Sequence, residues 1–371
     1  MSAKNQISNL LAKADVKING KRSWDIQVKN EALYSRLMSQ GSMGLGESYM
    51  DGWWESAELD EFFSKILSAD LSSQIKPSPA LIFSYLRSKM FNLQKSSRAF
   101  QIGERHYDVG NDLYQVMLDK RMVYTCAYWD KGAKNLDAAQ EDKLDLVCKK
   151  MKFKKGQRVL DIGCGWGSFA KYAAEKCGVK VVGVTVSKNQ VKLGNKLCKG
   201  LPVELRLQDY RELNEKFDHI VSLGMFEHVG KKNYRTYMEV ASRNLKDNGL
   251  FLLQTIGSNL STKSLDPWIE KYIFPNSILP SISEIAKASE NIFIMEDWHN
   301  FSYDYYLTLK SWFNNFDSHW DELKQNYDQR FYNMWKYYLK STAGGFKSRS
   351  IQLWQVVLSK HGVTGGYKSV R

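Results

Sequence analysis

The chain has 371 residues, 43% of them hydrophobic and 25% charged, which is ordinary for a globular protein of one to three domains. Its formal net charge of +13 favours an anionic partner, either nucleic acid or an anionic lipid surface, and leaves open a basic surface that has no such partner. The five cysteines have no paired or metal-binding spacing, and no apolar run approaches about 20 residues, so we expect reduced thiols, no metal, no signal peptide, no bilayer span and a cytoplasmic location.

Residues 1–92 are predicted to form a small, mainly helical N-terminal domain. Apolar residues recur at helical spacing at Ile7, Leu10 and Leu11, and again in "DEFFSKIL" and "PALIFSYLRSKMFNL". The polar and basic stretch that follows predicts a linker over residues 93–104. The remaining residues, 105–371, are predicted to form the second, larger domain.

From His106 onward the pattern changes to short apolar runs that alternate with helical patterns. Strands are expected at 158–163, 180–186, 203–208, 219–225 and 250–257, and helices at 167–176, 189–199 and 233–245. Asn248 and Gly249 are expected to end the last of these helices. This β-α-β series predicts an α/β fold with a mostly parallel, doubly wound sheet.

The turn after the first of these strands, "DIGCGWG", has glycine at every second position. It lacks the length and the lysine of a P-loop, and no carboxylate follows at the place where a dinucleotide fold holds its ribose. A strand ending in Asp-x-Gly-x-Gly-x-Gly is instead typical of S-adenosylmethionine-binding folds. Asp161, Gly163 and Gly165 would then meet the methionine end, and Gln208-Asp209 the adenine. A glycine-rich turn in another doubly wound fold is the alternative.

Ten stretches on both sides of the linker make the chain similar to a known family: "GSMGLGESYMDGWWE", "HYDVGNDLY", "YTCAYWD", "VLDIGCGWG", "VVGVTVSKNQ", "LQDYREL", "SLGMFEHVG", "DPWIEKYIFPN", "EDWHNFSYDY" and "IQLWQVV". They resemble the bacterial cyclopropane-fatty-acyl-phospholipid synthases, which are related to the mycolic acid cyclopropane synthases and methyltransferases. The resemblance implies a Rossmann-like S-adenosylmethionine-dependent methyltransferase domain at 105–371 and a lipid-associated domain at 1–92. It also implies transfer of a methylene group to the cis double bond of a phospholipid acyl chain, through methyl transfer, a carbocation and loss of a proton.

The resemblance implies two sets of binding residues besides the glycine turn. Further positions expected to bind the cofactor are Tyr124, Thr125, Thr185, Val186, Gln190, Gln208, Asp209 and Tyr210. Aromatic positions expected to line the substrate pocket, where ring faces stabilise positive charge, are Tyr128, Trp129, Phe226, Trp268, Tyr272 and Phe274. Each of these aromatic side chains is also a candidate for ordinary core packing.

The base implied by the resemblance is a bound bicarbonate ion in a cradle of Cys126, Glu227, Gln254, Ile256 and Tyr305. The family usually has histidine where this chain has Gln254. Glutamine can donate a hydrogen bond to an oxyanion but does not titrate near neutral pH. We therefore expect an altered bicarbonate affinity and pH profile. No histidine in the sequence is an evident partner for Cys126, so a catalytic thiolate is not expected.

Two other functions remain open at this point. C-methylation of the acyl chain without ring closure is the alternative reaction, and Gln254 keeps it open. An RNA-binding protein or RNA methyltransferase would account for the charge, but no RNA-binding module is recognisable, and we expect no nucleic-acid partner. The expected partners are a bilayer surface of unsaturated phospholipids at the inner face of the membrane, contacted peripherally through Lys89, Lys95, Arg98, Arg105, Lys231, Lys232 and Lys263, and a second copy in a homodimer.

Overall fold

The structure is a computed structural model that describes residues 2–69, 71 and 110–371. Its contacts divide the chain into two compact units. Unit 1 combines the described part of 1–91 with 263–275 and 305–351, and unit 2 combines the described part of 92–262 with 276–304 and 352–371. The predicted linker, 93–104, lies outside the described residues. The assignment of 1–92 to lipid association and of 105–371 to catalysis stays a proposal.

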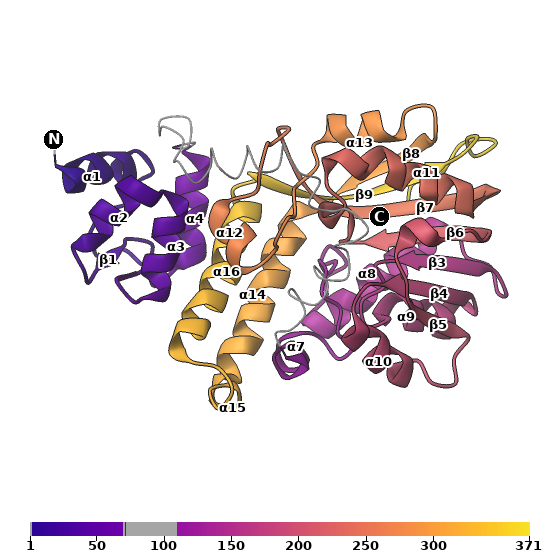
Figure 1. The fold of residues 1–371 in the computed structure, drawn as a ribbon, viewed down its shortest axis with the longest axis horizontal. Helices are drawn as coiled ribbons and strands as arrows, with labels where there is room; N and C mark the ends of the chain where they lie inside the picture. Colours follow the sequence, from indigo (N-terminus) through magenta and orange to yellow (C-terminus); the bar gives the residue numbers. More distant parts are fainter. Residues whose placement is uncertain (1, 70, 72–109) are drawn as a thin grey trace. The chain divides into compact units, whose positions relative to one another are not determined.

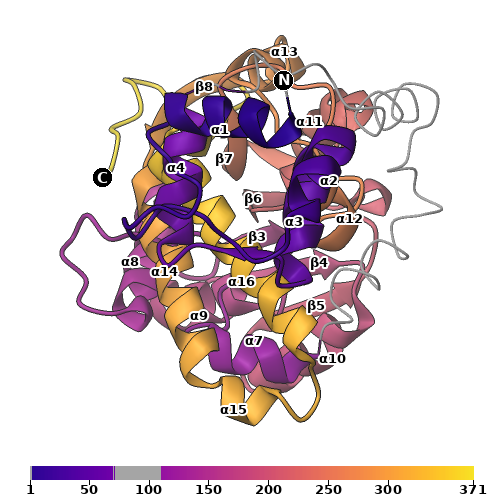
Figure 2. The same ribbon diagram turned by 90° about the vertical axis from the view of Figure 1, so that its left-hand side faces the viewer.

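Unit 1 is mainly helical, with one two-stranded antiparallel sheet in which Val28 pairs with Trp54. Ser2, Asp266 and Asp328 each accept backbone N–H bonds at the start of a helix, which explains where three of the helices begin. Helices α4 and α16 pack side by side (Figure 2). The elements are α1 (Ala3–Lys13), β1 (Gln27–Val28), α2 (Ala32–Gln40), α3 (Ser42–Met50), β2 (Trp54–Glu55), α4 (Leu59–Ser68), α12 (Pro267–Tyr272), α14 (Ser302–Ser318, in this unit from Tyr305), α15 (Trp320–Leu323) and α16 (Gln329–Lys347).

Aromatic rings fill the core of unit 1. Trp54 lies 5.1 Å from Tyr49 and 5.2 Å from Phe62 between ring centroids. Trp268 lies 4.5 Å from Tyr337 and is fully buried. Because these rings come from α3, β2, α4, α12 and α16, segments more than two hundred residues apart share one core.

Unit 2 contains a seven-stranded sheet in the order β5-β4-β3-β6-β7-β9-β8. Strands β3 to β7 pair in parallel, and β8 and β9 pair antiparallel. The sheet and the helices around it appear in Figure 1. The elements are α7 (Asn111–Met117), α8 (Leu136–Met151), β3 (Arg158–Ile162), α9 (Ser168–Cys177), β4 (Lys180–Thr185), α10 (Lys188–Leu197), β5 (Val203–Leu207), η2 (Tyr210–Glu212), β6 (Phe217–Leu223), η3 (Phe226–His228), η4 (Lys231–Asn233), α11 (Tyr234–Asn244), β7 (Leu245–Ser258), α13 (Ile282–Ser289), β8 (Ile294–Asn300) and β9 (Ile351–Ser359).

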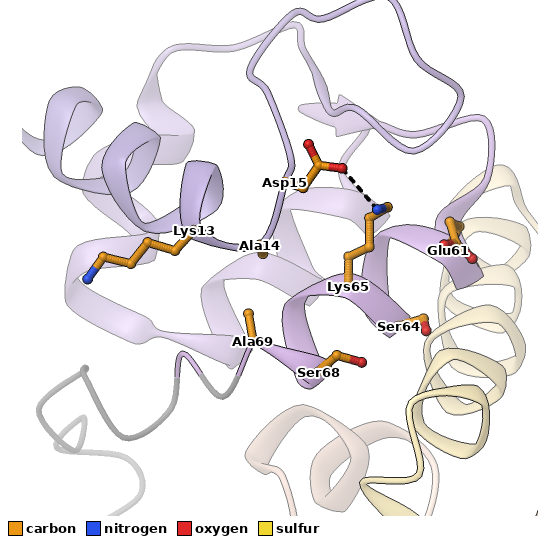
Figure 3. A pocket seen from close by; sticks show the side chains of 8 residues that line it. All are labelled: Lys13, Ala14, Asp15, Glu61, Ser64, Lys65, Ser68 and Ala69. Atoms are coloured by element: carbon orange, nitrogen blue, oxygen red, sulfur yellow. Dashed lines mark hydrogen bonds and ion pairs between the residues drawn. The ribbon is translucent and has the colours of Figure 1, made fainter.

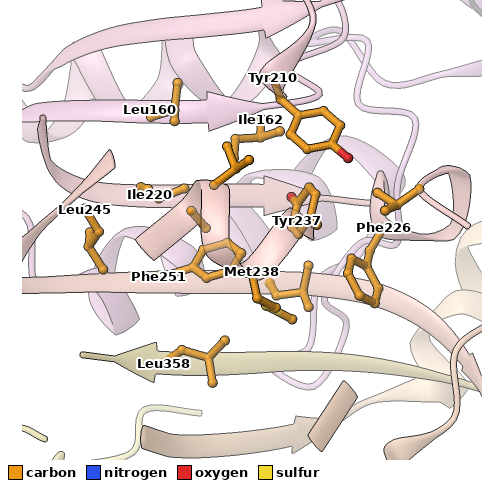
Figure 4. Close-up of a cluster of buried hydrophobic side chains, with 14 of the residues drawn as sticks. Leu160, Ile162, Tyr210, Ile220, Phe226, Tyr237, Met238, Leu245, Phe251 and Leu358 are labelled. Atoms are coloured by element: carbon orange, nitrogen blue, oxygen red, sulfur yellow. The ribbon is translucent and has the colours of Figure 1, made fainter. Parts of the chain in front are cut away.

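Alternate residues of the central strands enter two separate hydrophobic clusters. Leu160 and Ile220 pack with α11 and α13 in one cluster, part of which Figure 4 shows, and Val159 and Val221 pack with α8 and α9 in the other. Because both faces of the sheet are covered, the strands are apolar on both sides. The predicted doubly wound α/β fold is therefore confirmed, together with the five strands and three helices expected from about residue 158.

One boundary prediction is wrong. Helix α11 ends at Asn244, and Asn248 and Gly249 lie inside β7. A Cβ at Gly249 would lie 2.5 Å from the carbonyl oxygen of Asp218 in β6. The glycine therefore allows β7 to approach β6 closely and does not cap a helix. Strands β8 and β9 were not expected. Within the described ranges, no helix combines the length and the apolar character needed to cross a bilayer.

Candidate active site

A cavity opens in unit 2 at the carboxyl end of β3, and its walls include many of the predicted cofactor residues. Strand β3 ends at Ile162, and Gly163 turns the chain with φ +82°. The backbone N–H groups of Gly163 and Cys164 both donate to the carbonyl of Val184, which fixes the turn against β4. Predicted residues that line this cavity are Tyr124, Thr125, Asp161, Gly163, Gly165 and Gln190.

Asp161 brings a carboxyl group into this cavity. Its Oδ2 atom is buried and has no hydrogen-bond partner among the described residues. Burial raises the pKa of Asp161 to about 7, and the nearby charge of Lys143 partly opposes that rise. A buried carboxylate without a partner is unfavourable by itself, so this oxygen is suited to a cationic or hydrogen-bond-donating ligand.

Lys143 is a site residue that the sequence analysis missed. It lines the cavity from α8, is fully buried, and its Nζ donates to Thr125 Oγ1 at 3.0 Å. Burial lowers its pKa to about 8, although Asp119, Cys126 and Asp161 act in the opposite direction. A signal was present in the sequence, because Lys143 lies four residues after Ala139 and four before Val147, on the buried face of the helix.

The remaining predicted cofactor residues lie outside the cavity lining. Thr185 Oγ1 donates to Gln190 Oε1 at 2.8 Å, so it contacts a lining residue. Asp209 is buried, and both of its carboxylate oxygens accept bonds from the guanidinium of Arg211, at 2.9 and 2.5 Å. Tyr210 is buried in the core beneath α11. Binding by these residues, and by Val186 and Gln208, stays a prediction.

A second group of predicted residues includes Glu227 in η3. Glu227 Oε1 accepts from the backbone N–H of Ile256 at 2.5 Å. Its Oε2 is buried and has no partner within the part of the chain that the structure describes. Burial raises the pKa of Glu227 to about 7. A carboxyl group in this state can gain or lose a proton near neutral pH.

The backbone of Gln254 on β7 contacts the chain just before η3. Its carbonyl accepts from the N–H of Gly224 at 3.0 Å, and a Cβ at Gly224 would lie 2.9 Å from the side chain of Thr125. Cys126 follows Thr125, is fully buried, and its thiol donates to the carbonyl of Ala127 at 3.1 Å. Four of the five predicted cradle residues thus belong to unit 2.

The fifth cradle residue and half of the predicted aromatic positions belong to unit 1. Tyr305 stacks on Phe346 with 4.5 Å between ring centroids. Tyr272 donates its hydroxyl to Glu47 at 2.9 Å. Trp268 is packed in the aromatic core described above, and Phe274 lies 5.7 Å from Tyr338.

In unit 2, Phe226 is fully buried and stacks on Tyr234 at 4.3 Å, and Tyr128 is packed edge-on against Phe301 at 5.5 Å. The backbone N–H of Trp129 donates to Asp304 Oδ2 at 2.7 Å. These contacts are those of packed core and connecting residues. A role for the six aromatic residues in binding substrate stays a prediction.

Three further findings concern metal binding, a second hollow and the basic residues predicted to meet the membrane. Across residues 2–69, 71 and 110–371, no cluster of three His, Cys, Asp or Glu side chains could hold a metal ion. A hollow in unit 1, shown in Figure 3, contains none of the predicted site residues, and its Lys65 is paired with Asp15 at 3.1 Å. Lys231 is paired with Glu284 at 2.5 Å, and Lys89, Lys95, Arg98 and Arg105 lie outside the described residues.

Comparison with known proteins gives consistent matches. The family model described as mycolic acid cyclopropane synthetase matches residues 94–356. The cyclopropane-fatty-acyl-phospholipid synthase of Escherichia coli K12 is 52% identical over 364 residues, which cover 98% of this chain and 95% of that protein. A probable fatty acid methyltransferase of Pseudomonas putida is 35% identical over 271 residues, which cover 69% of this chain and 68% of that protein.

Two solved structures of similar fold come from the same group of enzymes. The cyclopropane synthase MmaA2 of Mycobacterium tuberculosis matches with a TM-score of 0.68 and 28% identity, over 73% of this chain and 100% of that one. The mycolic acid cyclopropane synthase CmaA1, complexed with SAH and CTAB, matches with a TM-score of 0.66 and 30% identity, over 70% and 98% of the two chains.

Proposed function

The chain belongs to the mycolic acid cyclopropane synthetase family of S-adenosylmethionine-dependent methyltransferases, and we propose that it transfers a methylene group to the cis double bond of unsaturated acyl chains in membrane phospholipids. The single observation that carries this proposal is the 52% identity, over nearly the full length of both chains, to the E. coli cyclopropane-fatty-acyl-phospholipid synthase. The motif resemblance found in the sequence is confirmed at the level of the family.

The cavity beside β3 fits S-adenosylmethionine. The cofactor supplies an electrophilic methyl carbon when bound. Gly163 and Gly165 present backbone without side chains at the turn, and Asp161 supplies a buried carboxylate with a free oxygen toward a ligand that carries positive charge. The complex of CmaA1 with SAH supports this assignment. Thr125, held by Lys143, would order the opposite wall.

The groups around Glu227 fit a small oxyanion, for which we propose bicarbonate. Bicarbonate would supply the base that removes a proton from the methylated chain. Gln254 Nε2 is a buried donor without a partner among the described residues, and Glu227 Oε2 is an acceptor in the same condition. Protonated Glu227 can donate from Oε2, and with a pKa near 7 the proton can be shared with a bound anion. Cys126 and Ile256 are the other proposed cradle residues of unit 2, and the part of Tyr305 of unit 1 stays a prediction.

We infer from one contact that this cradle rearranges when an anion binds. The N–H of Ile256 donates to Glu227 Oε1, so it is already used. An anion that takes this donor must displace Glu227 or share the N–H with it. Because Gln254 carries no charge, we propose that the carboxyl group of Glu227, with a pKa near 7, is the group of the cradle that titrates.

The reaction requires a site that stabilises positive charge on carbon and excludes water. Electron-rich rings meet both needs, and Tyr128, Trp129, Phe226, Trp268, Tyr272 and Phe274 are proposed to line the acyl pocket. Association with the inner face of the membrane and a homodimer are also proposed, on the resemblance alone. Simple C-methylation remains the second candidate, because Gln254 departs from the histidine usual in cyclopropane synthases and because the P. putida relative is a probable fatty acid methyltransferase.

Incubation with labelled S-adenosylmethionine and vesicles of unsaturated phospholipid tests the function. We expect the released fatty acids to gain one methylene unit at the double bond, with the ring confirmed by proton NMR. A product with a methyl branch and no ring would favour the second candidate. Vesicles of fully saturated phospholipid are the control and should gain no label. Lack of label in unsaturated lipid would remove both candidates.

The affinity for S-adenosylmethionine should depend on pH through Asp161. Its pKa lies near 7 in the protein without ligand, so the carboxyl group loses its charge as the pH falls below 7. We expect the dissociation constant to rise by up to about tenfold per pH unit below that point. Above pH 7 the affinity should continue to rise slightly as Lys143, whose pKa is about 8, loses its charge.

Calorimetric titration between pH 6 and pH 8.5 measures this dependence. In Asp161→Asn we expect weaker binding that changes little with pH below 7. An affinity that improves on acidification in the parent protein would contradict the assignment of Asp161 to a cationic ligand.

A further inference from the structure

Two buried glutamines form a pair between β7 and β9. Gln355 Nε2 donates to Gln254 Oε1 at 2.9 Å, and both side chains are completely buried. The other ends of the two amides, Gln254 Nε2 and Gln355 Oε1, have no hydrogen-bond partner among the described residues. Native proteins rarely leave buried amide groups unpaired, so this pair needs a functional or structural explanation.

In the structure, the Gln254 amide turns its oxygen toward Gln355, and its NH₂ group has no partner among the described residues. The two ends of a glutamine amide have nearly the same shape, and only their hydrogen-bond partners distinguish them. Because Gln355 occupies Oε1, the group that Gln254 leaves available is the NH₂ donor. A Gln254 turned the other way would present an oxygen, which repels an anion.

Gln355 is held in the sheet through its backbone. It lies opposite His299 in the register of β8 and β9, and His299 Nδ1 lies 3.0 Å from Lys150 Nζ on α8. Both histidine and lysine are buried. This arrangement on rigid elements suits a residue whose role is to set the direction of a neighbour.

We propose that Gln355 is a positioning residue that holds the Gln254 amide with its NH₂ group free for an oxyanion. This inference rests on the proposed bicarbonate site and deepens it, because it names the side chain that makes a neutral glutamine an anion donor. Gln355 contacts Gln254 and is assigned no contact with the anion. Its effect on anion affinity must therefore pass through Gln254.

The test compares Gln355→Met, Gln254→Met and the double variant in the full chain. Binding of ¹³C-labelled bicarbonate is followed by NMR line broadening, and S-adenosylmethionine affinity by calorimetry. We expect Gln355→Met to weaken bicarbonate binding about tenfold. Its S-adenosylmethionine affinity should stay within about twofold of the parent value. The double variant should bind bicarbonate as Gln254→Met does, since the two losses share one cause.

Gln352→Met is the matched control. Gln352 is also buried on β9, and its Oε1 accepts from Asn300 and from Ser302, both at 3.0 Å. The same substitution there loosens the strand without touching Gln254, and bicarbonate binding should stay unchanged. If Gln355→Met does not fold, Gln355→Glu preserves the shape and replaces the donor by an acceptor, and it should weaken binding at least as much.

Three results would overturn the inference. Unchanged bicarbonate affinity in folded Gln355 variants would remove it while leaving the proposed bicarbonate site intact. Additive losses in the double variant would show that Gln355 does not act through Gln254. Failure of the parent protein to bind bicarbonate would overturn the bicarbonate proposal and this inference together.

Discussion

Replacing Glu227 by glutamine is expected to lower kcat by about 100-fold or more, while S-adenosylmethionine still binds. Glutamine fills the same space and can still accept the N–H of Ile256, but it cannot exchange a proton. The parent carboxyl group, with a pKa near 7 and a free Oε2, is suited to share a proton with the base. Single-turnover measurement with labelled cofactor separates this loss from slower lipid exchange.

The same variant should be more stable than the parent protein at pH 8. Burial raises the pKa of Glu227 from 4.5 to about 7, so the folded state binds a proton more readily than the unfolded state. The protein therefore loses stability as the pH rises from 4.5 to 7, by about 3 kcal/mol at most, because Glu227 ionises more readily in the unfolded state. Glutamine avoids this cost. A variant that is both slower and more stable cannot owe its loss of activity to unfolding.

Glu296→Gln is the control for a general effect of losing a carboxylate in unit 2. Glu296 Oε1 accepts from Ser359 at 2.5 Å and from Val363 at 2.8 Å, and an amide oxygen can replace it. We expect unchanged kcat. If Glu227→Gln were as active as the parent enzyme, Glu227 would have no part in proton removal.

The architecture of unit 2 could be predicted from the sequence because its signals are local. Each central strand is a short apolar run, and each helix that follows has its own period, so residues 158–257 were assigned nearly in full. The turn proposed to bind the cofactor was equally visible, since Asp161, Gly163 and Gly165 lie within five residues. A local pattern of this kind can be recognised in the sequence without knowledge of how the elements pack.

The composition of unit 1 was not predictable in the same way. Trp268 joins the core of unit 1 through Tyr337 of α16 and through Met50 of α3, which lies 218 positions earlier in the sequence. Nothing in the sequence near residue 268 indicates that partner. The sequence therefore marked an aromatic insert without showing that 263–275 and 305–351 complete the unit that begins the chain.

The two site residues added by the structure were missed for different reasons. Lys143 breaks the apolar face of a helix, and that irregularity was available in the sequence. Gln355 lies in "IQLWQVV", where its importance depends on which amide faces it across β7. Such a residue can be identified only once the pairing of the strands is known, because its proposed role depends on a hydrogen bond to another strand and not on a sequence motif.

Gly163→Ala is expected to weaken S-adenosylmethionine binding by about 100-fold. Gly163 has φ +82°, and an alanine there costs about 1–2 kcal/mol in the left-handed region. Its Cβ would also lie 2.7 Å from the side chain of Met225, so Met225 or the turn must move. The turn moves to relieve these two costs, and cofactor binding must then restore it, which lowers the affinity by up to about 3 kcal/mol, or about two orders of magnitude. Equilibrium titration of the cofactor measures the loss.

Gly156→Ala separates backbone strain from damage to the site. Gly156 has φ +83°, and a Cβ there meets nothing within 4 Å. We expect this variant to lose about 1–2 kcal/mol of stability and to bind the cofactor normally. Gly163→Ala should in addition lower kcat, because Met225 directly precedes the turn that carries Glu227. Equal cofactor affinities in the two variants would show that the turn at Gly163 does not contact the cofactor. A lower kcat in Gly163→Ala, and not in Gly156→Ala, would tie the turn at Gly163 to Glu227 through the side chain of Met225.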